Sequence, residues 1–159
     1  MNLYSIALFV HIVGAVLLFV LLTVEGVALR VGFPYAPLNR ILGPVSALAV
    51  LIPGLYMMKA EWGWTGWVAT GIVAWVFIAV LGTITGITVM RGRMSNRTAA
   101  VSWLIRTGMA TGVVFDMTVK PNVTIAVLAV VVGAAIGAAV SIARRRELIS
   151  SAPLPRPLP

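Results

Sequence analysis

The sequence contains no cysteine, and only 10% of its 159 residues are charged. The absence of cysteine excludes disulfides, thiolate metal ligands and cysteine nucleophiles. The scarcity of charge excludes an ordinary soluble domain, in which charged residues make up about 25%. Glycine-rich phosphate loops, paired catalytic carboxylates and nucleophile triads are also missing, which excludes a hydrolase of the soluble type.

What remains is strongly apolar, with 60% hydrophobic residues and a mean hydropathy of +1.05. A membrane-spanning helix needs about 20 apolar residues, so the chain is long enough for four or five spans. We therefore predict an all-α, polytopic membrane helix bundle. Four spans are plain in the sequence, at residues 3–29, 38–58, 64–90 and 123–143.

The segment at 98–121 is ambiguous, because it is long enough to span but carries Arg106 and Asp116. If it spans, nearly all basic residues outside the spans fall on one side; if it lies on the surface, they divide almost evenly. Basic residues concentrate in cytoplasmic loops, so we predict five transmembrane helices, with the N-terminus outside and the C-terminus cytoplasmic. The alternative is four spans and one interfacial helix. We expect one domain at 1–147 and a proline-rich, flexible cytoplasmic tail at 148–159.

Glycines at four-residue spacing occur in each of the last three predicted helices: Gly82 and Gly86, Gly108 and Gly112, and Gly133 and Gly137. Small residues at this spacing let membrane helices approach closely. We expect the pairs to pack the bundle internally, and the alternative is contact with a second copy or with a larger membrane complex.

The single histidine, His11, lies in the apolar stretch "LFVHIVGAVL", near the middle of the first span. An ionisable group at this depth is a functional hypothesis by default. Three interpretations stay open: a neutral imidazole bonded to a neighbouring helix, a haem or metal ligand, and a proton or quinone relay. For a haem, Gly14 would leave room one turn away. The second position on the iron would be open, or taken by His11 of another copy, or by a methionine, for which Met57, Met58, Met109 and Met117 are candidates by residue type.

The other intramembrane charges are Glu25, Arg106 and Asp116. Glu25 and Arg106 both lie toward the cytoplasmic side of the predicted bundle, so we expect an ion pair that joins the first and fourth helices. Asp116 and Lys120 are four residues apart and are candidates for a second pair. The net charge of +8 sits in clusters beside the spans, which indicates lipid headgroups and no nucleic acid as the partner.

The stretches "LFVHIVGAVLLFVLL" and "DMTVKPN" resemble small bacterial membrane proteins of the CopD and HemJ type and their uncharacterised relatives. The resemblance implies a bacterial cytoplasmic membrane and a histidine that ligates haem or a metal, a role that only His11 can take. HemJ-type proteins are haem-binding protoporphyrinogen oxidases, and CopD-type proteins are associated with copper uptake. This sequence lacks the tryptophan typical after that histidine and an intramembrane lysine of the HemJ pattern, so it is most similar to the uncharacterised branch.

The leading hypothesis is therefore an integral membrane protein that binds haem or a metal ion through His11, and the sequence favours a binding protein over an enzyme. A second hypothesis is a small accessory or structural subunit of a homo-oligomer or larger membrane complex. A third is a small transporter with a water-accessible cavity at His11, Arg106 or Asp116.

Overall fold

The computed structural model describes residues 2–150, which form five long helices and one π-helical turn. The helices are α1 (Leu3–Val31), α2 (Ala36–Met57), α3 (Gly66–Met90), α4 (Asn96–Val119) and α5 (Val123–Ser150), and the π-helical turn η1 (Met58–Trp62) extends α2. All five helices are long and apolar enough to cross a membrane. The predicted polytopic bundle of five helices is confirmed, and α4 is among the five that are long and apolar enough to span. Most of the predicted tail, residues 151–159, lies outside the described residues.

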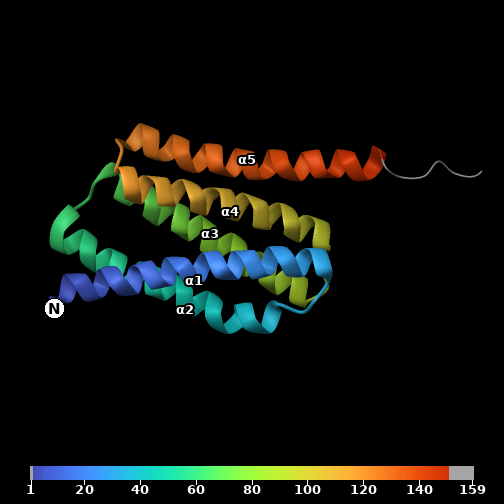
Figure 1. The fold of residues 1–159 in the computed structure, drawn as a ribbon, viewed down its shortest axis with the longest axis horizontal. Coiled ribbons are helices and arrows are strands. Elements are labelled where there is room, and N and C mark those ends of the chain that lie inside the picture. Colours follow the sequence, from blue (N-terminus) through green and yellow to red (C-terminus); the bar gives the residue numbers. More distant parts are fainter. Residues whose placement is uncertain (1, 151–159) are drawn as a thin grey trace, which may run out of the picture.

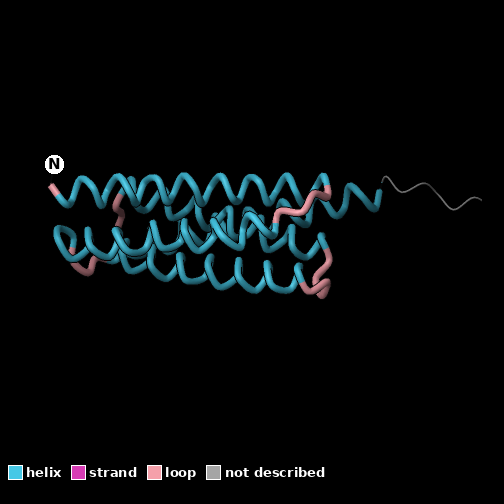
Figure 2. The backbone as a smooth tube through the Cα atoms, turned by 90° about the horizontal axis from the view of Figure 1, so that it is seen from below, coloured by secondary structure: helices cyan, strands magenta, loops and turns pink. Residues whose placement is uncertain are grey.

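The helices run up and down between two ends of the molecule (Figures 1 and 2). One end, the tryptophan end, carries Trp62, Trp64 and Trp67 around η1 and the start of α3. The opposite end, the arginine end, carries the arginines beside the termini of α1 to α4: Arg30, Arg40, Arg91, Arg93 and Arg97. Successive helices are neighbours except that α2 and α3 touch little, while α1 also contacts α4. Two grooves follow from this loose α2–α3 contact.

Local signals in the sequence start the helices where the connections end. The side chain of Asn2 accepts the Ser5 N–H at 2.8 Å, and Ser95 does the same for Thr98 at 3.2 Å. At the start of α5 the amide oxygen of Asn122 accepts the Ile125 N–H at 3.0 Å. Each contact satisfies an N–H that the first helical turn leaves free.

Glycine brings α4 and α5 into backbone contact. A methyl group on Gly108 would overlap the carbonyl of Gly133, one on Gly137 would overlap that of Leu104, and one on Gly112 would lie 2.7 Å from the carbonyl oxygen of Ala129. The prediction that these pairs pack the bundle internally is confirmed for α4 and α5. In α3 the pair divides, because Gly82 faces Arg106 whereas Gly86 faces open space.

The same kind of approach joins α1 to α2. A Cβ on the buried Gly14 would lie 2.8 Å from Ala49. The space beside Gly14, where the sequence suggested room for a macrocycle, is therefore filled by α2. This close crossing fixes the height at which His11, one turn away, meets the second helix.

Gly108→Ala should destabilise the bundle, because the added methyl must push α4 and α5 apart. Overpacking of this kind costs about 1–3 kcal/mol. Gly86→Ala is the matched control, since its methyl would meet nothing within 4 Å. Thermal unfolding of the purified variants in one detergent checks this: the midpoint should fall by several degrees for Gly108→Ala and stay at the parent value for Gly86→Ala. Equal midpoints for the two variants would contradict the described α4–α5 contact.

Candidate functional site

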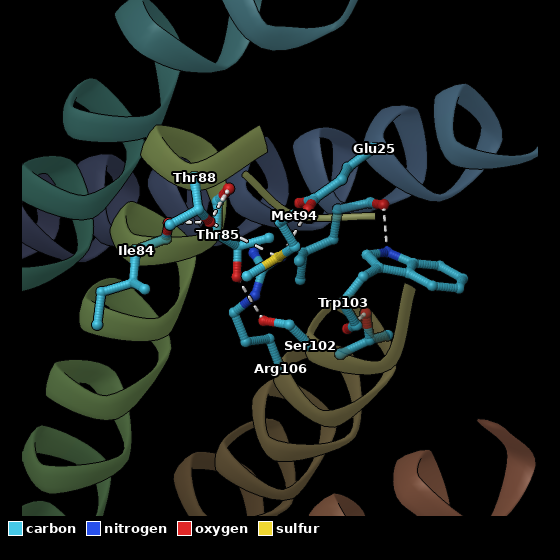
Figure 3. A network of polar contacts seen from close by, with 10 residues as sticks. Glu25, Ile84, Thr85, Thr88, Met94, Ser102, Trp103 and Arg106 are labelled. Carbon is cyan, nitrogen blue, oxygen red and sulfur yellow. Dashed lines mark hydrogen bonds and ion pairs between the residues drawn. The ribbon is translucent and has the colours of Figure 1, made fainter. Parts of the chain in front are cut away.

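A buried ion pair joins α1 to α4. Arg106 Nη2 donates to Glu25 Oε1 at 2.5 Å, and both residues are buried (Figure 3). The predicted bridge between these residues is confirmed. The partners are 81 positions apart in the chain, so this contact joins two helices that are distant in sequence.

Small residues make room for the groups around the pair. Gly82 of α3 leaves space for the guanidinium, because a Cβ there would lie 3.3 Å from Arg106 Nη1. Gly26 faces the indole ring of Trp103, whose Nε1 donates to the Leu22 carbonyl at 2.7 Å. Nearby, the hydroxyls of Thr85 and Ser102 bond at 2.7 Å. These contacts form a polar seam through α1, α3 and α4 (Figure 3).

If either of the two charges is present in the bundle, the folded protein needs the other one to neutralise it. Removing one partner of a buried pair leaves an uncompensated charge and costs about 3–5 kcal/mol, whereas replacing both is often neutral. In a membrane the alternative environment for a lone charge is hydrocarbon, which makes such residues rare and paired.

Double-mutant analysis should show this asymmetry. We expect Arg106→Gln and Glu25→Gln each to lower stability strongly, by about 3–5 kcal/mol, and the double variant to cost less than the sum of the two. Steric trapping or detergent unfolding of the four proteins gives the coupling energy. Additive effects would mean that the two side chains do not interact in the folded protein.

Asp116 lies near the tryptophan end and is wholly buried. Neither of its carboxylate oxygens has a hydrogen-bond partner within residues 2–150. The suggested Asp116–Lys120 pair is wrong for the described structure, in which Lys120 Nζ instead lies 3.6 Å from the centre of a Trp62 ring. The physical reason lies in the helix end: Lys120 closes α4 in a left-handed conformation, with φ of 52°, and its ammonium gains a cation–π contact there.

His11 is half-buried on α1 and bonds to the backbone of α2. Its Nδ1 lies 2.7 Å from the carbonyl oxygen of Val50. A carbonyl only accepts, so Nδ1 must carry the hydrogen, and in the neutral imidazole Nε2 then holds a free lone pair. Gly54 of α2 leaves room for the ring, because a Cβ there would lie 3.2 Å from His11 Cε1.

The imidazole borders a large groove that α1, α2, α3 and α4 form together. Its volume is about 1100 Å³ and its lining is mostly apolar, with aromatic and polar groups toward the tryptophan end. Residues of that kind at this end of the lining are Tyr4, Trp62, Trp67 and Lys120. Met57, Met58 and Met117 also line this groove, whereas Met109 lies in the apolar core with Leu22 and Ile78. The groove is of the size that holds cofactors in proteins.

A second groove, of about 500 Å³, lies between α1, α2 and α3 nearer the arginine end. Leu18, Trp75 and Ile78 line both grooves and so separate them. The second groove reaches the ion pair, since Glu25 and Arg106 are part of its wall. The structure thus brings His11 and the Glu25–Arg106 pair to different grooves, and Asp116 lines neither of the two.

Sequence reasoning missed two contributors to these sites. The Val50 carbonyl carries no side-chain signal, although Gly54, which leaves room for the imidazole, lies one turn later in the sequence. Tyr35, in the short connection between α1 and α2, is buried beside the second groove. Only its position next to a helix start, in "GFPYAP", distinguishes it in the sequence.

No protein-family model matches the chain, and no curated protein or solved structure is significantly similar to it. The fold defines the class as an integral membrane protein of the polytopic helix-bundle type.

Proposed function

We propose that this protein binds haem in the groove beside His11, with Nε2 as an axial ligand. The observation that supports the proposal is the Nδ1 contact with the Val50 carbonyl at 2.7 Å. Histidines that ligate metals use their second nitrogen in this way, since such a bond fixes the tautomer and the ring orientation and raises the basicity of the ligand. In haem proteins a single histidine is a common axial ligand.

The donor set favours haem over a bare metal ion. Within the described residues, no three His, Cys, Asp or Glu side chains come together as a metal site would need. A porphyrin supplies the equatorial ligands of its iron, so one protein nitrogen is enough to hold it. A haem would contribute one-electron chemistry, and the axial ligand and the burial of the site are what the protein uses to tune it.

The remaining groups of the groove suit a planar, amphipathic ligand. Its apolar walls exclude water, and Lys120 and the Tyr4 hydroxyl stand at the tryptophan end, where they can hold carboxylates. Tyr4 also accepts a hydrogen bond from Trp62 Nε1 at 3.2 Å. Met57, Met58 and Met117 are thioethers on the same lining, and by residue type they would be the candidates for a second ligand.

The proposed setting is the cytoplasmic membrane of a bacterium, with the arginine end in the cytoplasm. The concentration of arginines beside the termini of α1 to α4 supports this orientation. An accessory subunit that docks through glycine would have to use another surface, because the glycines of α4 and α5 already contact each other. No feature of the described grooves favours a transport function over cofactor binding.

Absorption spectra of the protein purified from cells supplied with haem test the proposal. We expect a Soret band in the parent protein that is lost in His11→Ala and restored when imidazole is added to that variant. His11→Gln is the matched control for packing, because its amide N–H can still donate to Val50 while the side chain ligates iron poorly. We expect His11→Gln to fold like the parent and to lack the band. A colourless parent protein, or a band unchanged in both variants, would overturn the assignment of His11.

A further inference from the structure

The second groove contains buried hydrogen-bond donors that no part of the described chain uses. The hydroxyl of Tyr35 and the Nε of Arg106 are buried and lack hydrogen-bond partners within residues 2–150. Both residues line the groove, and they are 7% and 4% exposed. Unsatisfied buried polar groups are rare and need an explanation, and an unseen ligand is one.

The start of α2 adds a second group of unused donors at the same place. The N-cap of α2 is Tyr35, which makes no side-chain capping bond, and the first turn contains no acidic residue. Pro37 in this turn has no N–H, but the N–H of Ala36 and the helix dipole still make the end favourable for an anion. Ala36, Asn39 and Arg40, from the first turn and the start of the second, line the groove.

The charges at this end are positive. Arg106 is neutralised by Glu25, but Arg40 lies at the rim of the groove without a partner among the described residues. Arg91 directly follows Met90, another residue of the lining. Burial and the nearby Glu25 carboxylate raise the pKa of the Tyr35 phenol, an effect that Arg106 partly offsets. The phenol is consequently a hydrogen-bond donor at neutral pH.

Away from this polar end the groove is apolar. Its inner wall includes Leu18, Leu21, Leu48 and Ile78, and the sparse contact between α2 and α3 leaves the side open to lipid. A volume of about 500 Å³ is in the range that small ligands occupy. The ligand must therefore combine an anionic head with an apolar chain that arrives from the bilayer.

We propose that this groove is a binding site for one anionic phospholipid, with its phosphate at Tyr35, Asn39 and Arg40 and an acyl chain between α2 and α3. The phosphate accepts from the Tyr35 hydroxyl, the Arg40 guanidinium and the N–H of Ala36 at the α2 terminus. The acyl chain covers apolar side chains of α1 and α3. The site is separate from the His11 groove, and the proposal does not depend on haem binding.

Native mass spectrometry of the full chain tests this proposal with two probes that share acyl chains, dioleoylphosphatidylglycerol and dioleoylphosphatidylcholine. We expect one phosphatidylglycerol to remain bound under conditions that remove phosphatidylcholine. Arg40→Gln and Tyr35→Phe should each weaken retention by about fivefold or more, as expected for loss of a hydrogen bond to a charged group. Arg30→Gln and Arg97→Gln are the matched controls, because these arginines are exposed at the same end but lie outside the groove.

Thermal unfolding separates a binding defect from a folding defect. The Tyr35 hydroxyl has no partner within the described residues, so Tyr35→Phe should leave the midpoint of the delipidated protein unchanged. The same variant should lose the increase that phosphatidylglycerol gives to the parent. If Tyr35→Phe fails to fold, Arg40→Gln decides the question alone, since that side chain is exposed.

Three results would overturn the proposal. Equal retention of the two lipids would exclude recognition of charge, and an equal loss of binding in the Arg30 and Arg97 controls would show diffuse attraction to the whole arginine end. Displacement of the lipid by millimolar inorganic phosphate would identify a site for a free anion instead of a lipid.

Discussion

The bundle depends on the requirement that a charge inside the membrane be neutralised by another part of the protein. Glu25 and Arg106 satisfy each other across α1 and α4, and neither helix can rotate or slide without separating them. The pair therefore fixes the relative height of the first and fourth helices. Dispersion and close packing drive helix association in lipid. They define the relative height of two helices less sharply than an ion pair, which requires its two groups to lie within hydrogen-bond distance.

Helices packed by glycine and helices held by polar contacts have different roles in this fold. The backbones of α4 and α5 meet at glycine, which leaves no space between them. Between α2 and α3 there is no such run of contact, and the two grooves occur on that side of the molecule. Ligand sites thus form where packing is incomplete, and the ion pair keeps the walls of the smaller groove in place.

Much of the architecture could be predicted from the sequence, because hydropathy and charge distribution act over whole segments. The span at α4 followed from the distribution of arginines, and the Glu25–Arg106 pair followed from the depth of the two residues. The contact between Gly14 and α2 could not be predicted, because residue spacing shows which residues share a helix face but not which other helix packs against that face. Lys120 illustrates a second limit: its nearness to Asp116 in the chain suggested a pair, but the left-handed end of α4 directs the ammonium to Trp62.

The role of a lone imidazole in an apolar helix depends on the backbone of the neighbouring helix α2 as well as on the side chain itself. Gly54 leaves room for the imidazole against α2, and the Val50 carbonyl determines which nitrogen of His11 carries the hydrogen. His11 is half-buried, and its ring borders the larger groove. In the described structure only Nδ1 is bonded, while Nε2 is left with a lone pair beside a groove of cofactor size. That asymmetry is the physical basis for treating His11 as a ligand.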